Sequence, residues 1–433
     1  MKANIKMESI PFARPYIGKE EEEAVLAVLR SGWLTTGKET LEFEKEFADF
    51  FKNNGGQETA SEAASGGAEP LYCMAVNSAT SGLHLALEAC GIGEGDLVLV
   101  PSITFTATAE VVSYLGAEVV FVDVKKDSFH IDPAALENTL ERLNKGKPPY
   151  PPGKSGGEGF GPRGKAKAVM PVHYGGLPCG MEEILSVAER YGLKVIEDAA
   201  HSFPSFAPGK TKTGQWAGLM GDVGVFSFYA TKTITTGEGG MVVTRDKAAA
   251  DRIKIMRSHG IDRSVWNRYT DAGASWYYEV VAPGFKYNIP DILSALGRVQ
   301  LSRAMELLSM RKKIASIYDE AFGSDPHFTI PPTGSGDARH LYPLRLNKDT
   351  LSIGRDQFAA KMQEQGIGIS VHFIPLHTMP YYRERYSLKE EDLPETLNSY
   401  RRLISLPIWP GMSDAEVNRV ITVVKTLGSE YTV

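Results

Sequence analysis

Lys232 is the only charged residue between Val223 and Gly237, in a stretch that is otherwise apolar or hydroxyl-bearing. The stretches on either side, 223–226 and 241–244, consist mostly of β-branched or aromatic residues and favour strands. Burying an ammonium ion is costly, but a neutral amine can be tolerated and can condense with an aldehyde. By itself the stretch is compatible with a reactive lysine and equally with a surface lysine in a hairpin loop.

Three further stretches carry polar or aromatic residues where an apolar run ends. Residues 77–82, NSATSG, precede a helix whose free N–H groups and hydroxyls can bind phosphate, although they match neither a Walker loop nor a dinucleotide turn. Phe105 can offer a flat aromatic face, and Asp198 can pair with a cationic ring nitrogen. Taken singly, each also suits an ordinary structural role as a helix cap, a core aromatic or a loop cap.

Together the four stretches meet the requirements of one cofactor. An aldehyde needs a lysine amine, an electron-accepting pyridine needs a carboxylate at its nitrogen, its phosphate needs hydroxyl and N–H donors, and its ring needs a stacking group. Lys232, Asp198, the 77–82 stretch with Ser227, and Phe105 supply these in turn. We therefore predict pyridoxal 5'-phosphate (PLP). The alternative is a structural or interaction protein in which Lys232 and Asp198 only pack.

The elements around these residues are expected to alternate strand with helix. Strands are predicted at 72–76, 97–100, 119–124, 168–173, 195–198, 223–226 and 241–244, and helices at 19–29, 41–51, 81–90, 107–115, 133–143 and 181–191. This alternation predicts an α/β domain with a mainly parallel sheet. The candidate residues fall at the carboxyl ends of the strands, where such sheets bind ligands.

The pattern changes after residue 290. One long helix is expected from Asp291 to Lys313 and on towards Phe322, followed by strands at 340–346 and 367–373 and helices at 355–365 and 414–427. We predict a large domain over residues 1–310, beginning with an extended arm, and a smaller α+β domain over 311–433. Low-complexity inserts at 53–70 and 145–165 are expected to be surface excursions without chemistry.

Composition excludes several classes of function. The net charge of −6 gives no basic surface for nucleic acid or an anionic membrane. No apolar run approaches the ~18 residues of a membrane span. Three cysteines without metal or redox spacing suit a reducing compartment. We expect a cytoplasmic protein without a metal site, a nucleic-acid partner or a membrane segment.

The motifs as a set resemble those of the DegT/StrS family of PLP-dependent nucleotide-sugar aminotransferases. The matching stretches are PFARP at 11–15, SGWLTTG at 31–37, NSATSGLHLAL at 77–87, PSITFTATAE at 101–110, PVHYGG at 171–176, EDAAH at 197–201, FSFYATKTITTGEGG at 226–240, PGFKYNIPDILSALG at 283–297 and GIGISVHFIPLH at 366–377. The resemblance implies the fold type I architecture of PLP enzymes, similar to aspartate aminotransferase.

The family resemblance also implies roles for three catalytic residues. Lys232 would bind the cofactor aldehyde covalently and shuttle protons, Asp198 would pair with the pyridine nitrogen, and His201 would lie near the ring and its phenolic oxygen.

The remaining cofactor contacts carried over from the family are as follows. Thr80, Ser81 and Ser227 would bind the phosphate, and Phe105 would stack on the ring. Asn288 would reach the phosphate of the neighbouring subunit, which implies a homodimer with shared active sites.

The resemblance narrows the reaction as well. Relatives with histidine in place of the lysine are sugar dehydratases, and Lys232 argues against that activity. The TTGEGG turn, FKYN at 285–288 and the segment at 372–386 look most like enzymes that aminate C4 of a nucleotide-linked keto sugar with glutamate, such as the aminotransferase of UDP-4-amino-4-deoxy-L-arabinose synthesis. The alternatives are a 3-keto-sugar aminotransferase, a dehydratase of the same fold and a non-catalytic PLP-binding regulator.

Substrate contacts are the least defined. Candidates for the donor carboxylate or the nucleotide diphosphate are basic residues that could equally pack loops: His259, Arg268, His372 and His377. Candidates for the sugar pocket are Trp33, Thr35 and Thr36.

Overall fold

The computed structural model describes residues 9–54, 70–150, 161, 163–207, 216–262, 277–334 and 336–433. Most of the first predicted insert, about half of the second, and Arg268 lie outside the described residues. No helix in the described ranges has the length and apolar character needed to cross a membrane.

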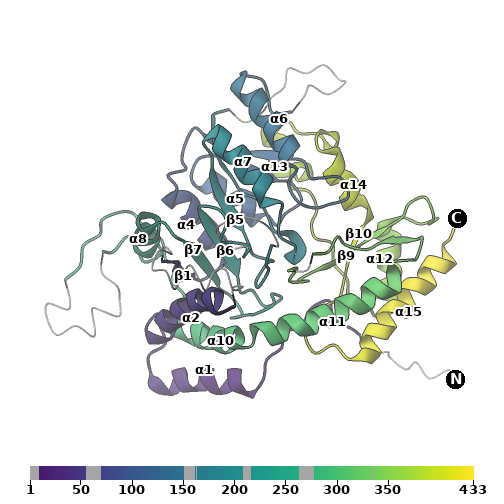
Figure 1. Cartoon of the computed structure of the whole chain (residues 1–433), viewed down its shortest axis with the longest axis horizontal. Helices are drawn as coiled ribbons and strands as arrows, with labels where there is room; N and C mark the ends of the chain where they lie inside the picture. Colours follow the sequence, from purple (N-terminus) through teal and green to yellow (C-terminus); the bar gives the residue numbers. More distant parts are fainter. Residues whose placement is uncertain are drawn as a thin grey trace.

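A seven-stranded sheet forms the centre of the large domain (Figure 1). Its strands are β1 (Tyr72–Val76), β2 (Asp96–Pro101), β3 (Glu118–Val122), β4 (Lys165–Val169), β5 (Lys194–Asp198), β6 (Val223–Ser227) and β7 (Gly240–Thr244). They are ordered β1-β7-β6-β5-β4-β2-β3, with β7 antiparallel to both neighbours and all other neighbouring pairs parallel. The predicted α/β class with a mainly parallel sheet is confirmed.

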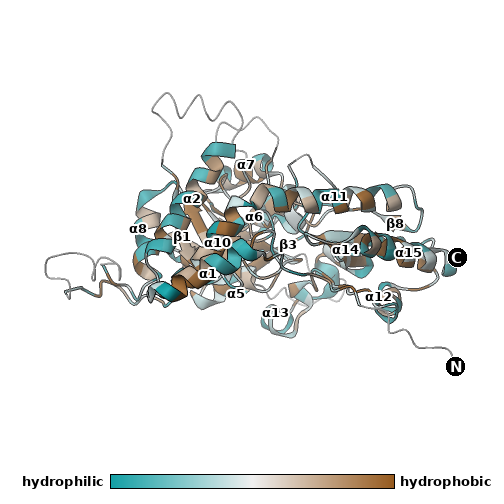
Figure 2. Cartoon of the chain, turned by 90° about the horizontal axis from the view of Figure 1, so that it is seen from below, coloured by the Kyte–Doolittle hydropathy of each residue, from teal (hydrophilic) through white to brown (hydrophobic). Residues whose placement is uncertain are grey.

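Both faces of the sheet are covered, because successive side chains of a strand point to opposite faces. Met74 and Val76 of β1 pack towards α4, α5 and α8, whereas Cys73 and Ala75 pack towards α2. The apolar strands accordingly lie between helices whose outer sides are hydrophilic (Figure 2). The helices of this domain are α1 (Lys19–Ser31), α2 (Lys38–Asn54), α4 (Ala79–Ala89), α5 (Ala107–Tyr114), α6 (Pro133–Asn144), α7 (Met181–Tyr191), α8 (Lys247–Met256) and α10 (Asp291–Ser302), with a 3-10 turn η1 (Tyr174–Gly176).

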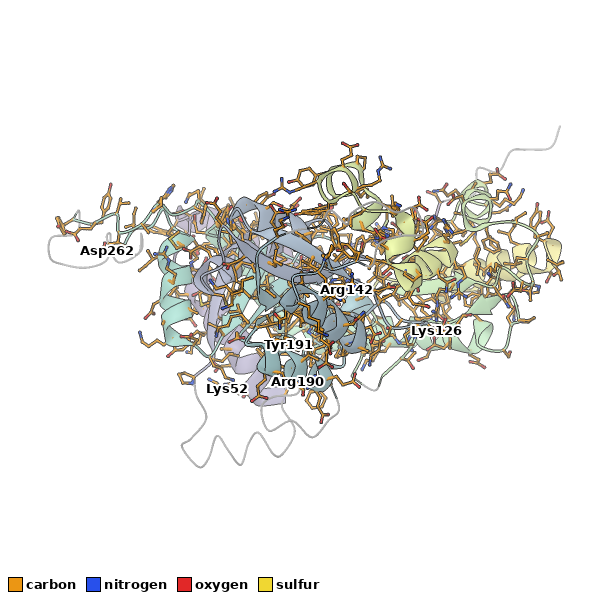
Figure 3. The ribbon with its side chains drawn as sticks, turned by 90° about the horizontal axis from the view of Figure 1, so that it is seen from above. Lys52, Lys126, Arg142, Arg190, Tyr191 and Asp262 are labelled. Carbon is orange, nitrogen blue, oxygen red and sulfur yellow. The ribbon has the colours of Figure 1, made fainter. Side chains whose placement is uncertain are left out.

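The outer helices carry their charges on the solvent side. Arg190 of α7 pairs at 2.7 Å with Glu137 of α6, and both side chains are substantially exposed. Figure 3 shows Arg190 and Tyr191 at the surface of this layer. An exposed pair of this kind contributes little stability, about 0–1 kcal/mol. The layer is therefore held mainly by its apolar inner side.

The long helix predicted from residue 291 to 322 is wrong in one respect, because it is two helices. α10 ends at Ser302, and α11 (Ala304–Phe322) follows after Arg303, whose backbone (φ −100°, ψ 5°) leaves the helical conformation. The Arg303 guanidinium is held at 2.9 Å by Glu21 and lies over the Tyr16 ring, contacts that no local pattern encodes. α11 then runs from the large domain into the C-terminal one (Figure 1).

The C-terminal region has its own core around α11. Its elements are β8 (Phe328–Thr329), β9 (Tyr342–Leu346), α12 (Arg355–Glu364), η2 (Leu376–Thr378), α13 (Pro380–Tyr386), η3 (Glu390–Asp392), α14 (Pro394–Arg402), β10 (Leu403–Leu406) and α15 (Asp414–Glu430), with sheet order β10-β9-β8. Tyr382 and Tyr386 of α13 pack instead on the core of the large domain. The domain boundary at residue 311 stays a prediction.

The strand predicted at residues 367–373 is wrong. The segment makes only isolated bridges, from Ile367 to Ile10 of the N-terminal arm and from Ser370 to Ser405. Because Ile367 and Ser370 pair with different partners, the segment forms no continuous ladder. This irregular course brings His372 and Phe373 into the cavity described next.

Candidate active site

A cavity of about 530 Å³ lies at the carboxyl ends of β5 and β6. The large domain contributes Asp198, Ser227 and Lys232 to its wall, and the C-terminal region contributes His340 and His372. The volume falls within the roughly 300–1,000 Å³ of cofactor and small-molecule sites. The two residues on which the predicted chemistry depends therefore face one space.

Lys232 lies in the turn after β6, where its N–H donates to the Tyr229 carbonyl at 2.9 Å. Its surroundings lower the pKa of the amine from its ordinary value to about 8. Burial is the main cause; the Asp198 carboxylate opposes the shift, and the Arg311 guanidinium adds to it. An amine with this pKa can be present in both the neutral and protonated forms near neutral pH, as a nucleophile and proton carrier requires.

Asp198 is the last residue of β5, and its carboxylate is fixed before any ligand binds. Oδ2 accepts the Thr108 hydroxyl at 2.7 Å, and Oδ1 accepts the Ala200 N–H at 3.1 Å. Thr108 is itself 2.7 Å from the Thr104 hydroxyl. Burial raises the pKa of Asp198 against these hydrogen bonds. A cation brought to this carboxylate would lower that pKa again, so the site favours a protonated ring nitrogen.

Glu197, the neighbour of Asp198, anchors this strand end from the other side. Its carboxylate accepts the backbone N–H groups of Gly218 at 2.8 Å and of Met220 and Gly221 at 2.6 Å. His173 Nε2 lies 2.8 Å from the same carboxylate, entirely buried. Such a fully bonded buried network restricts the rotation and displacement of the residues beside it.

The first turn of α4 provides an anion site next to this carboxylate. Ser78 caps the helix by accepting the Ser81 N–H at 3.1 Å, and the Thr80 hydroxyl makes no hydrogen bond within the described part of the chain. Ser78, Thr80 and Ser227 all line the cavity, and the helix N-terminus favours negative charge. Ser81 is buried, its hydroxyl donates to Asn77 at 2.8 Å and its N–H to Ser78, and it does not line the cavity, so its contact with a phosphate stays a prediction.

Two aromatic groups flank the cavity. Phe105 is 57% exposed and lies on the cavity wall, which leaves its face open to a flat ligand. His201 is buried, with Nδ1 accepting the Gly175 N–H at 3.3 Å, so that its proton is placed on Nε2. Burial lowers the pKa of His201 well below its usual range, which keeps the ring neutral.

These residues fit PLP. An amine with a lowered pKa, a preorganised carboxylate, a helix N-terminus with open hydroxyls and an exposed aromatic face border a cavity of suitable volume. No group of three or more metal-binding side chains occurs among the described residues.

Asn288 and the residues predicted for the sugar pocket lie outside the cavity. Asn288 donates to the Thr36 hydroxyl at 2.6 Å, and that hydroxyl donates to the Ile289 carbonyl at 2.5 Å. Trp33 is 3.4 Å from the Thr36 carbonyl, and the Thr35 carbonyl accepts the Asp291 N–H at 3.4 Å. None of the predicted members of this group, Trp33, Thr35, Thr36 and Asn288, lines the cavity of their own chain.

The four basic residues predicted to bind substrate also lie in different places. His372 lines the cavity, and its Nδ1 is 2.9 Å from the Ser405 hydroxyl. His377 is buried outside it, between Ser102 at 2.7 Å and the Glu390 carbonyl at 3.1 Å, which is a packing role. His259 donates its N–H to the Phe285 carbonyl at 2.8 Å and does not line the cavity. Arg268 lies outside the described residues.

Sequence reasoning missed two participants. One is Thr108, in the first turn of α5, which is 2.7 Å from the hydroxyl of Thr104 in the bend before that helix; because Thr104 lies outside the helix, helical spacing does not reveal the pair. His340 lies on the wall with its ring 4.6 Å from that of His201, and no local pattern around residue 340 distinguishes it from a packed histidine.

Fold and site together define a PLP-dependent aminotransferase of fold type I. The model of the DegT/DnrJ/EryC1/StrS aminotransferase family matches residues 15–425, and the chain belongs to this family. This membership confirms the predicted family, enzyme class and cofactor.

Individual relatives align with this chain over nearly their whole length. The spore coat polysaccharide biosynthesis protein SpsC of Bacillus subtilis is 40% identical over 422 residues, covering 96% of this chain and 97% of that protein. The structure of PseC of Helicobacter pylori, an aminotransferase of pseudoaminic acid biosynthesis, aligns with a TM-score of 0.79 at 27% identity, over 98% of this chain and 100% of PseC. Spr1654 of Streptococcus pneumoniae, described as a sugar aminotransferase and solved in its PMP form, aligns with a TM-score of 0.80 at 27% identity, over 97% and 99% of the two chains.

Proposed function

We propose that this enzyme transfers the amino group of glutamate to C4 of a nucleotide-linked 4-keto sugar that is destined for a surface polysaccharide or lipopolysaccharide. Glutamate becomes 2-oxoglutarate and the keto sugar becomes an amino sugar, so no external oxidant or reductant is needed. The observation that carries the proposal is that Lys232 and Asp198 face one cavity in a member of an aminotransferase family. The relatives SpsC and PseC support a sugar as acceptor, because both are named for polysaccharide or sugar biosynthesis.

PLP, when bound, supplies an aldehyde that carries the amino group and a ring that accepts the electron pair released at carbon. Lys232 Nζ would anchor that aldehyde between turnovers. As a free amine, Nζ would take the proton from the glutamate α-carbon and later give a proton back. A pKa of about 8 allows the amine to act in both directions near neutral pH.

The other side chains would bind and orient PLP. Asp198 keeps the ring nitrogen protonated, with its carboxylate held by Thr108 and Ala200. Phe105 would cover the ring face, and Thr80, Ser227 and the N-terminus of α4 would hold the phosphate; all three of these side chains line the cavity. Neutral His201 contacts the ring region without adding charge.

C4 amination is favoured by the turn after the lysine. Glu238 and Gly239 of the TTGEGG sequence line the cavity, so this turn can contact the sugar. A 3-keto acceptor is the remaining outcome for an active aminotransferase.

We also propose that the enzyme is a cytoplasmic homodimer in which Asn288 serves the partner's site. Asn288 and Thr36 form a polar pair that does not line the cavity of their own chain. Residues 277–281 expose four large apolar side chains near Asp262, at one end of the molecule (Figure 3): Tyr277, Tyr278, Val280 and Val281. An exposed apolar patch of this kind is typical of a protein contact.

The test is incubation of the purified enzyme with glutamate and a panel of UDP-, GDP- and dTDP-linked 4-keto sugars. We expect 2-oxoglutarate to form with one nucleotide class and NMR of the product to show nitrogen on C4. Nitrogen on C3 would replace the C4 assignment, and release of water without amine transfer would indicate a dehydratase. Light scattering that reports a monomer would remove the shared site.

A further inference from the structure

Arg311 of α11 is buried, with 2% of its surface exposed, at the junction of three segments that form the floor of the cavity. Its guanidinium donates to the His340 carbonyl at 3.2 Å, the Ile408 carbonyl at 2.9 Å and the Thr231 carbonyl at 3.2 Å. Thr231 immediately precedes the reactive lysine, and all three acceptor residues line the cavity. One side chain of the C-terminal region thus holds the lysine turn in place.

The charge of Arg311 is not balanced by an acid. Within the described ranges Arg311 makes no ion pair with a carboxylate, and its Nε has no hydrogen-bond partner. Burial lowers the pKa of Arg311 to about 10, and no acidic neighbour counters the effect. Buried arginines are ordinarily paired with an acid, as Arg345 is with Asp127 at 3.3 Å. A purely structural tie would have no need of the unpaired charge.

That charge acts on Lys232. Asp198 and Arg311 influence the amine in opposite directions, the first favouring its protonated form and the second its neutral form. Glu238 also lines the cavity but is exposed on the turn. The other titratable groups around the amine are neutral near pH 7, because burial lowers the pKa of each of them: His201, His340 and His372.

We propose that Arg311 is a positioning residue that fixes the Lys232 turn through the Thr231 carbonyl and, through its unpaired charge, increases the neutral fraction of the Lys232 amine. The inference rests on the assigned role of Lys232 as the reactive amine, and it does not depend on which sugar is the acceptor. Loss of the charge would leave more of the amine protonated at neutral pH and slow its reaction with an aldehyde.

The experiment measures the Lys232 amine directly in the full-length protein freed of cofactor. The amine is labelled with trace acetic anhydride over a range of pH, and the Lys232 peptide is quantified by mass spectrometry. Arg311→Gln removes the charge and retains a donor, whereas Arg311→Lys retains the charge with fewer donors. Arg345→Gln is the matched control, because Arg345 is equally buried, at 2% exposed, but is paired with Asp127, which does not line the cavity.

Wild type and Arg345→Gln should show half-maximal labelling near pH 8. Arg311→Gln should shift this midpoint upward by about one pH unit, an approximately tenfold loss of neutral amine at pH 7. Arg311→Lys should stay close to wild type. A midpoint in Arg311→Gln equal to wild type, or equal shifts in both Arg311 variants, would overturn the proposal. If Arg311→Gln does not fold by circular dichroism, Arg311→Met, which also removes the charge and retains the apolar stem, takes its place: an upward shift of the midpoint supports the role of the charge, and a midpoint near pH 8 refutes it.

Discussion

The two walls of the cavity are built differently. The large-domain wall consists of short motifs at the ends of neighbouring strands and at the start of a helix, with Asp198 held by Thr108 and backbone. The C-terminal wall consists of single residues from separate segments, among them His340 and His372. We infer that the first wall holds the cofactor and the second shapes the substrate side. Four substitutions on these walls should differ in the size and kind of their effects.

Lys232→Ala should have the largest effect. Both the covalent anchor and the proton carrier are lost, so turnover should fall by about 10³-fold or more. Steady-state transamination, together with the loss of the visible absorbance of lysine-bound PLP, checks this. Lys348→Ala changes an exposed lysine and should behave as wild type. Retention of both the absorbance and full turnover in Lys232→Ala would remove the central assignment.

Asp198→Asn should cause the second-largest loss of turnover. An amide cannot stabilise a protonated ring nitrogen, and losing one preorganised electrostatic contact typically costs about 10²–10³-fold in rate. The affinity for PLP, measured by dialysis, should fall as well, because this wall is predicted to hold the cofactor. Unchanged turnover in a PLP-loaded variant would contradict the pairing.

Thr108→Val tests the support of that carboxylate separately. The variant removes the 2.7 Å hydrogen bond to Asp198 and preserves the shape of the side chain. A hydrogen bond to a charged group is worth about 1.5–3 kcal/mol, which corresponds to a loss of roughly 10–100-fold. The double variant with Asp198→Asn should lose little more than Asp198→Asn alone; fully additive losses would show that Thr108 acts independently.

His372→Gln should have the smallest effect and a different kind of effect. We expect the KM for a substrate to rise about 2–10-fold, as for the loss of a neutral hydrogen bond, while PLP affinity is unchanged. Burial lowers the pKa of His372 to about 4, so the ring is already neutral at pH 6 and the rise in KM should be the same from pH 6 to 9. Loss of PLP instead of a change in KM would erase the distinction between the walls.

The same division explains what the sequence could predict. Lys232, Asp198 and the 77–82 stretch each follow an apolar strand at a short distance, so local pattern and the geometry of parallel sheets together placed them at one edge. His340 and Arg311 meet Lys232 only through tertiary packing. The break at Arg303 was hidden for the same reason, because its contacts to Glu21 and Tyr16 span most of the large domain in sequence.

The place of β7 in the sheet has a consequence for how the molecule is made. Among the strands that the structure describes, β1 is the first in the chain and has only β7 as a sheet neighbour, so it stays unpaired in the sheet until Thr244 has been synthesised. The start of α4, which is proposed to bind the phosphate, follows directly on β1, and the lysine turn lies between β6 and β7. Closure of the nascent sheet and assembly of the reactive centre are therefore one late event in biosynthesis, and a chain truncated before Gly240 should have neither.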